Sequence, residues 1–151
     1  MPLSPRQINV FLFFKLPAAF FCGVRLKSLE KTSCTTTVKH RWINQNPFGS
    51  LFWAVQGMAA ELSTGALIMA VIKGNGLPVS MLVIGNKAHF SKKAKGRITF
   101  ICKDGLLAAQ SVQKAIETGE GQIMTMLSEG TNEQGDVVSV FEFEWSVRGK
   151  G

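Results

Sequence analysis

One almost uncharged run, residues 51–72, dominates the hydrophobic pattern of the chain. It is apolar around most of a helical circumference, and a helix of that kind lies inside protein or inside lipid. At 1.5 Å per residue it would span roughly 30 Å, which suits both environments. Asn46, Pro47 and Ser50 predict a capped helix start before the run. Lys73 and the glycines after it predict the helix end.

The polar and small residues within the run favour the protein interior. In a membrane, Gln56 and Glu61 would lie near mid-bilayer, where a carboxylate without a partner is unfavourable. Glycine, alanine, serine and threonine gather between residues 57 and 66 and would let another backbone approach closely. Because the rest of the chain looks like strands, we expect a sheet to cover this helix and no integral membrane span.

Alternation of apolar and polar residues predicts strands on both sides of the central helix. The expected strands cover residues 24–29, 34–42, 79–90, 96–103, 122–128 and 137–148. The last is the clearest, because Phe141, Phe143 and Trp145 share one face. A further helix is expected over 105–118, capped by Asp104. One buried helix and a largely antiparallel sheet make an α+β domain.

The N-terminal stretch is rich in phenylalanine. Ser4, Pro5 and Gln7 form the signature of a capping box, so we expect a helix from about residue 5 to residue 16. A secretory signal or a peripheral membrane anchor over residues 8–21 is the alternative, but Lys15 interrupts the apolar run and no cleavage site follows. We expect one domain over 1–151, with the segment 1–17 packed on it and 149–151 as a flexible tail.

Charge and cysteine content narrow the choice of partners. The net charge of +7 suits nucleic acid, an anionic membrane or a phosphate-bearing small molecule such as coenzyme A. The lysines are not interleaved with aromatic residues as a strand-binding groove requires, so we expect no nucleic acid. Cys22, Cys34 and Cys102 are far apart and odd in number, which favours a reducing cytoplasm. With only His40 and His89 as imidazoles and no zinc spacing, we expect no metal.

At this point the sequence resembles a known group. Residues 44–52 with the helix after them, residues 88–96, and the helix at 105–118 are similar to those of hotdog-fold proteins, within an uncharacterised branch of thioesterase-like members. The resemblance covers roughly residues 8–148. It implies a curved, largely antiparallel sheet wrapped around the long central helix. It also implies a homodimer or dimer of dimers, since this fold usually builds its sites between subunits.

Active relatives carry an asparagine, then His-Gly-Gly, then an acid seven residues after the second glycine. Asn44 matches the asparagine, but seven residues after Gly49 stands Gln56 rather than an acid. A glutamine can hold a water or a carbonyl but cannot accept a proton as a carboxylate does. The nearest acid, Glu61, lies about 140° further round the helix and cannot replace an acid on the same face.

The candidate catalytic chemistry needs an oxyanion donor and an activated water. The amides of Gly49, Ser50 and Leu51, at the expected helix start, would polarise a thioester carbonyl. Glu61 would activate water, and Gln56 would position it. A carboxylate buried at position 61 would have a raised pKa. The candidate catalytic residues are Asn44, Asn46, Gly49, Ser50, Gln56 and Glu61. Alternatively, the first four form an ordinary helix cap, Glu61 makes a structural hydrogen bond, and Gln56 is a packing residue.

Clustered cations supply a candidate binding site for coenzyme A. The cations lie on and after the turn between the expected strands 79–90 and 96–103. Related hotdog enzymes use this turn near the phosphates of coenzyme A, and clustered cations suit phosphate groups. A solvated turn explains the cations equally well. The candidate substrate-binding residues are Leu51, Lys92, Lys93, Lys95 and Arg97.

The resemblance and the apolar composition lead to a functional expectation. We expect hydrolysis of an acyl thioester with a hydrophobic acyl group, carried by coenzyme A or acyl carrier protein, in the cytoplasm. No cofactor is expected other than coenzyme A as part of the substrate. The alternative is a non-catalytic hotdog protein that binds acyl carriers or lipids.

Overall fold

The computed structural model describes residues 3–150. Its helices and strands follow one another in the order α1 Pro5–Lys15, α2 Pro17–Phe21, β1 Arg25–Leu29, β2 Cys34–Lys39, the short 3-10 helix η1 Trp42–Asn44, α3 Trp53–Asn75, β3 Val79–Phe90, β4 Arg97–Cys102, α4 Gly105–Thr118, β5 Gln122–Thr131 and β6 Val137–Gly149. All of the predicted helices and strands are present. The short helix α2 and the 3-10 helix η1 are additions.

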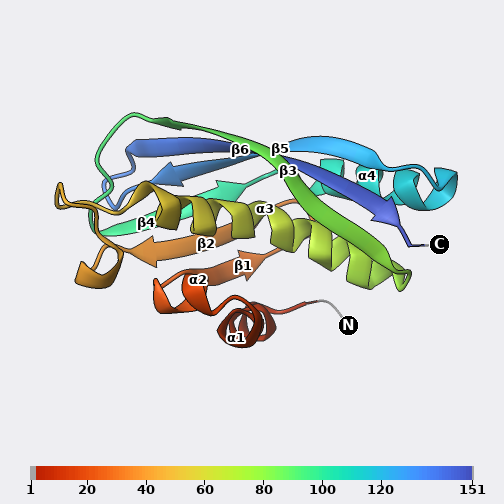
Figure 1. The fold of residues 1–151 in the computed structure, drawn as a ribbon, viewed down its shortest axis with the longest axis horizontal. Coiled ribbons are helices and arrows are strands. Elements are labelled where there is room, and N and C mark those ends of the chain that lie inside the picture. The colour runs from red at the N-terminus through yellow and green to blue at the C-terminus, as the bar shows by residue number, and fades with distance from the viewer. Residues whose placement is uncertain (1–2, 151) are drawn as a thin grey trace.

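The strands form a single antiparallel sheet in the order β1-β2-β4-β5-β6-β3. Figure 1 shows α3 lying along this sheet, with the edge strand β3 crossing over its C-terminal half. The other edge strand, β1, is next to α1 and α2 (Figure 1). The predicted architecture, a sheet curved around a central helix, is therefore confirmed.

Small side chains let α3 approach the sheet closely, as the sequence predicts. A Cβ atom on Gly65 would lie 3.2 Å from Cζ2 of Trp145 in β6. The preceding residue, Thr64, contacts the same tryptophan: its Oγ1 accepts a hydrogen bond of 2.9 Å from Trp145 Nε1. Ser63 Oγ and Ser128 Oγ in β5 lie 2.7 Å apart. These contacts satisfy the buried hydroxyl groups of Ser63 and Thr64.

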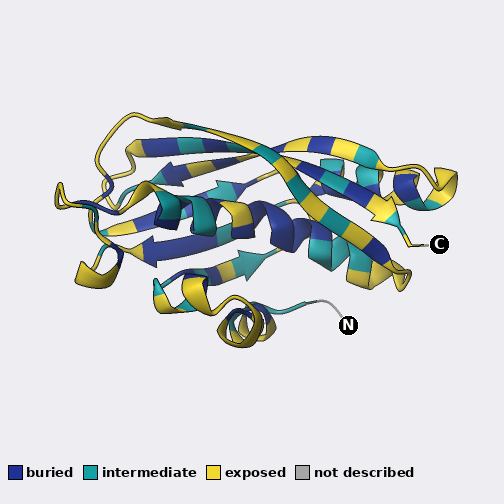
Figure 2. Cartoon of the chain, viewed as in Figure 1, coloured by how far each residue is buried: buried dark blue, intermediate teal, exposed yellow. Residues whose placement is uncertain are grey.

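The burial of α3 favours a core helix over a membrane span. By length and mean hydropathy it could cross a membrane, but 61% of its most apolar window is buried inside the domain. Its inner face packs with the inward residues of the sheet in one hydrophobic core (Figure 2). Burial on that scale is typical of the core helix of a soluble protein.

The start of α3 differs from the prediction. The helix begins at Trp53 with Phe52 in the N-cap position, and no side chain caps it. Asn46 instead accepts hydrogen bonds from the amides of Phe48, at 2.9 Å, and Ser50, at 3.1 Å. An asparagine bonds to amides of its own loop as readily as it caps a helix, and here it closes a turn before the helix begins.

Two further local predictions are wrong for a similar reason. The strand expected to reach residue 42 ends at Lys39, and Trp42 is 84% exposed in η1. The side chain of Asn44 stops this strand by accepting a hydrogen bond of 2.7 Å from the amide of Arg41. Asp104 stands at the N-cap position of α4 as expected, but its side chain makes no capping bond, because its Oδ2 accepts a hydrogen bond of 2.8 Å from the amide of Leu127 in β5.

The N-terminal helix α1 packs against the rest of the chain through two buried side chains. The Ser4–Gln7 capping box is present, and Ile8 and Leu12 are buried in the core. Asn9 adds a specific link to the sheet. Its side-chain amide pairs with both backbone groups of Leu26 in β1, at 3.0 and 2.8 Å. This pairing satisfies backbone groups that the edge strand would otherwise expose.

Candidate functional site

A cleft of about 490 Å³ lies between the segment that leads into α3 and the loop that follows β3. The first segment contributes aromatic and small polar residues, and the loop contributes cations. The lining residues are Asn46, Pro47, Phe48, Ser50, Leu51, Phe52, Trp53, Gln56, Phe90, Ser91, Lys92, Lys93 and Ala94. Most of the surface is apolar, with a few convergent polar groups, which is typical of a small-molecule site.

Gln56 is the buried polar residue of this cleft. It is only 4% exposed and stands in the first turns of α3. Its Oε1 accepts a hydrogen bond of 2.7 Å from Ser139 Oγ in β6. Ser139 is itself buried and pairs with Phe90 across the β3–β6 ladder. Among residues 3–150, no acceptor bonds to Gln56 Nε2, so this lining residue keeps its side-chain donor available.

The free backbone donors lie later in the chain than the sequence predicts. Of the expected donors, the amide of Gly49 bonds to the carbonyl of Asn46, at 3.3 Å, and that of Leu51 bonds to the carbonyl of Ala94, at 2.8 Å. The amide of Ser50 is also engaged, as described above. All three are satisfied because the loop folds back on itself and on the loop after β3. They cannot serve as the oxyanion donors that the sequence predicts.

The first amides of α3 are free instead. Those of Trp53 and Ala54 have no acceptor within the described part of the chain, since Phe52 offers no capping side chain. The positive end of the helix dipole adds to their preference for negative charge. Trp53 lines the cleft together with Gln56, one helical turn further on. The cleft therefore lies beside a helix start with two free backbone amides, of which only that of Trp53 belongs to a lining residue, and the side chain of Gln56 adds an amide group.

The two candidate asparagines hold loops in place. Asn44 is 2% exposed and uses its whole side chain, because its Nδ2 donates to the carbonyls of Cys22 and Lys39 at 2.8 Å. It does not line the cleft. Asn46 does line it, but its Oδ1 is occupied by amides of its own turn. Both residues shape the cleft by fixing the segment before α3.

Glu61 is not brought to this cleft. It is exposed on α3, on the same side of the helix as Trp53 and Gly57, which precede it at intervals of four residues. Its carboxylate has no ion-pair or hydrogen-bond partner among residues 3–150. The side chain reaches solvent, yet neighbouring protein removes part of its hydration and raises its pKa. Glu61 is therefore not buried as the sequence analysis assumed, although its pKa is raised as expected.

The predicted cation cluster divides into two parts. Lys92 and Lys93 line the cleft, whereas Lys95 and Arg97 lie outside its lining. Lys92 Nζ is 2.7 Å from Oδ2 of the exposed Asp136, and this contact lowers the pKa of that carboxyl. Lys93 is exposed at the cleft rim with no acidic partner within the region described. Leu51, 1% exposed, forms part of the apolar wall.

The sequence prediction missed several residues that line the cleft or contact its lining. The exposed aromatic rings of Phe48, Phe52, Trp53 and Phe90 line the cleft. Their sequence signal was weak, because they come from two segments about 40 residues apart. Ser139 had a clearer signal, since it is the polar member of the inward face of the last strand.

Metal chemistry has no support in the described residues. No group of three histidine, cysteine or acidic side chains is placed to hold an ion within residues 3–150. The cysteines are free, and burial raises the pKa of Cys34 and Cys102 to about 12. Thiols of that kind are poor nucleophiles at neutral pH. Within the described residues, the polar side chains that line the cleft carry amide, hydroxyl and ammonium groups.

Several solved structures with the same architecture are of hotdog proteins described as thioesterases or as a probable thioesterase. A Pseudomonas aeruginosa protein of unknown function, PA5026, described as a probable thioesterase, matches with a TM-score of 0.82 at 25% identity, covering 99% of each chain. The thioesterase HI1161 from Haemophilus influenzae matches with a TM-score of 0.74 at 14% identity, covering 99% of this chain and 93% of its own. A mutant of the thioesterase PA1618, also from Pseudomonas aeruginosa, has a TM-score of 0.71 at 15% identity, covering 99% and 97%. The fold is therefore the hotdog fold.

Sequence comparison places the chain in a family. No curated protein matches it. A family model does match, over residues 5–147, and this region includes the cleft, all of α3 and nearly all of the sheet. The chain therefore belongs to the family described as Domain of unknown function (DUF4442).

Proposed function

We propose that this protein hydrolyses an acyl thioester of coenzyme A or of an acyl carrier protein. The observation that carries the proposal is the placement of Gln56 in the cleft, held by Ser139, one turn from the free amides that begin α3. Hotdog neighbours with thioesterase names support the same class of substrate. The three free cysteines suit a reducing cytoplasm, which we propose as the compartment.

The cleft fits the two halves of such a substrate. Exposed aromatic rings and the buried Leu51 favour a hydrophobic acyl group. Lys93, which has no acidic partner in the described region, would meet a phosphate of the carrier at the rim. In this pose the amides of Trp53 and Ala54 would bond to the thioester oxygen, and Gln56 Nε2 would position either that oxygen or the attacking water.

Among residues 3–150, no carboxylate or imidazole that could activate water lines the cleft. We propose that Glu61 of a second copy of the chain supplies the missing carboxylate. Glu61 is exposed on α3, and the edge strand β3 lies at the open edge of the sheet, with Leu82 and Ile84 exposed on it. An edge of this length is suited to pairing with a symmetric copy of itself, which would continue the sheet across a homodimer. A dimer of dimers is compatible with the same pairing.

The proposed reaction is a simple hydrolysis. Glu61 removes a proton from water as the water oxygen attacks the thioester carbonyl. The resulting oxyanion is stabilised by the first amides of α3. It then collapses, the carbon–sulfur bond breaks, and the proton passes to the leaving sulfur. The products are a carboxylic acid and a free thiol.

Subunit mixing tests both the activity and the shared site. Gln56→Leu and Glu61→Gln are each expected to lose thiol release from acyl thioesters. If the two residues act from opposite subunits, an equal mixture forms hybrid dimers with one intact site. Activity then returns to roughly a quarter of the wild-type value, because half of the dimers are hybrids with one of two sites intact. A mixture as inactive as its components would contradict the shared site.

A non-catalytic hotdog protein that binds acyl carriers or lipids is the second candidate. The observation that favours it is the glutamine where active relatives carry an acid, buried and bonded to Ser139 as a structural residue would be. Saturable binding of an acyl thioester without release of free thiol would establish this alternative.

A further inference from the structure

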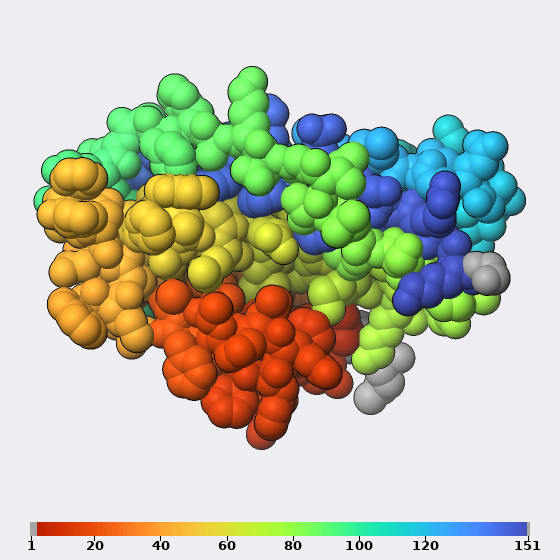
Figure 3. All heavy atoms as spheres, viewed as in Figure 1, coloured from red at the N-terminus to blue at the C-terminus, as the bar shows by residue number. Residues whose placement is uncertain are grey.

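The outward side of the N-terminal helices forms an exposed aromatic surface, which the proposed active site does not use. We define the aromatic surface as Val10, Phe13, Phe14, Phe20 and Phe21. Four of these side chains are between 44% and 72% exposed, and Phe20 is partly buried. In Figure 3 the N-terminal segment, coloured red to orange, protrudes from the body of the molecule. Exposed apolar patches of this kind on a folded domain mark interaction sites.

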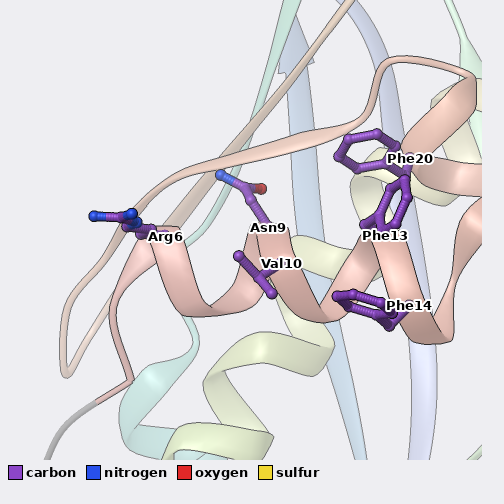
Figure 4. A pocket seen from close by; sticks show the side chains of 6 residues that line it. All are labelled: Arg6, Asn9, Val10, Phe13, Phe14 and Phe20. Carbon is purple, nitrogen blue, oxygen red and sulfur yellow. The ribbon is translucent and has the colours of Figure 1, made fainter.

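Helix α1 is apolar on both sides, although only one side is needed for the core. Ile8 and Leu12 point inward and are at most 1% exposed. Val10 and Phe14 stand on the outer side, next to a hollow of about 600 Å³ (Figure 4). A helix that only covered the domain would carry polar residues there. Packing within the chain therefore leaves the outer side of α1 unexplained.

The aromatic rings are held by one another and by a cation. The ring centre of Phe13 lies 5.0 Å from the ring centre of Phe14 and 5.1 Å from that of Phe20, and both pairs are in edge-to-face contact. Arg25 stacks on Phe20, with its guanidinium carbon 3.7 Å from the ring centre. Its Nη1 donates to the carbonyl of Phe20 at 2.8 Å. The surface is thus a preorganised cluster on a packed helix pair.

The segment that carries the aromatic surface has charges of one sign. Residues 1–29 contain four cations and no acidic residue, the first being Glu30. Arg6 borders the hollow and the exposed Lys15 ends α1, directly after Phe14. Two copies of this surface would bring like charges together, which disfavours a symmetric dimer through it. A partner with a negatively charged surface and an apolar interior complements both properties.

We propose that the aromatic surface docks the protein on an anionic lipid bilayer. The phenylalanine rings enter the boundary between head groups and acyl chains, while the surrounding arginine and lysine side chains meet the lipid phosphates. The helices lie on the membrane and do not cross it. The capping box and the pairing of Asn9 with β1 keep α1 anchored to the domain, so that docking carries the whole protein to the surface.

Vesicle flotation tests this proposal with the full chain. Wild-type protein is expected to float with vesicles of 30% phosphatidylglycerol in phosphatidylcholine, and to do so much less with pure phosphatidylcholine or at 0.5 M salt. Phe14→Ser with Phe21→Ser is expected to reduce the bound fraction roughly tenfold, because both rings leave water on docking. The matched control is Ile123→Ser, another exposed apolar residue, at 64% exposure on β5.

A charge variant keeps the test independent of the aromatic substitutions. Lys15→Glu is expected to weaken flotation several-fold, whereas Lys114→Glu, at an exposed lysine on α4, keeps it near the wild-type level. The proposal fails if the wild-type protein stays in solution with anionic vesicles. It also fails if the serine variants bind as well as Ile123→Ser, or if they change the oligomeric state measured by light scattering while flotation is unaffected.

Discussion

The hydrogen bond between Ser139 and Gln56 joins stability to the proposed site, so its removal gives the sharpest local prediction. Ser139→Ala deletes a buried hydroxyl and leaves Gln56 Oε1 without its 2.7 Å donor. An unsatisfied buried polar group costs about 1–3 kcal/mol. For a chain of 151 residues this corresponds to a decrease in Tm of roughly 2–12 °C. Without its partner, the Gln56 side chain also loses its fixed orientation, so thioester hydrolysis should fall.

A double-mutant cycle measures this coupling. Gln56→Leu alone strands the hydroxyl of Ser139, whereas Gln56→Leu with Ser139→Ala removes both polar partners. The double variant should therefore be more stable than the sum of the single changes predicts, by at least about 0.5 kcal/mol. Ser146→Ala, a half-buried serine elsewhere on β6 with no side-chain hydrogen bond in the described residues, is the control and should change Tm little.

Urea unfolding at 25 °C gives the four free energies of the cycle. Additive effects, within about 0.3 kcal/mol, would show that the two side chains do not interact. The proposed placement of Gln56 would then be wrong, and its role in the cleft would lose its structural basis.

Three further predictions concern other parts of the chain. Partial desolvation raises the pKa of Glu61, so the folded state holds its proton more tightly; Glu61→Gln should make the protein slightly more stable at pH 7, with the gain disappearing below the ordinary carboxyl pKa in thermal melts. A Cβ atom on Gly105 would collide with the backbone carbonyl of Lys31, so Gly105→Ala should lower the free energy of unfolding by about 1–3 kcal/mol, whereas Gly74→Ala, with open space around it, should be neutral or stabilising. Lys93→Glu should raise KM for a coenzyme A thioester more than it lowers kcat, because Lys93 would contact the carrier rather than the reacting carbonyl.

The sequence predicted the architecture well, because periodicity is a property of whole segments. The inward face of the last strand, with Phe141, Phe143 and Trp145, is buried as expected. The small residues of α3 predicted close contact with a sheet, and Gly65 lies against Trp145. Patterns repeated over ten or more residues are little affected by any single side-chain contact.

The site could be predicted only in part, because single polar side chains decide it. Asn46 could cap a helix or close a turn, and its sequence neighbours do not distinguish the two. The turn moves the start of α3 to Trp53 and with it the free amides. Gln56 was identified from its spacing, but its partner Ser139 is 83 residues away in the chain. That pairing depends on strand register, which the sequence alone does not specify.

The most direct test of the proposed function is the release of free thiol from a panel of acyl-coenzyme A substrates by wild-type protein and by Gln56→Leu. We predict turnover of hydrophobic acyl groups by the wild-type protein, and its loss in a Gln56→Leu variant that retains the wild-type circular dichroism spectrum. No thiol release from any member of the panel, or full activity in the folded variant, would contradict the proposal that this cleft hydrolyses thioesters.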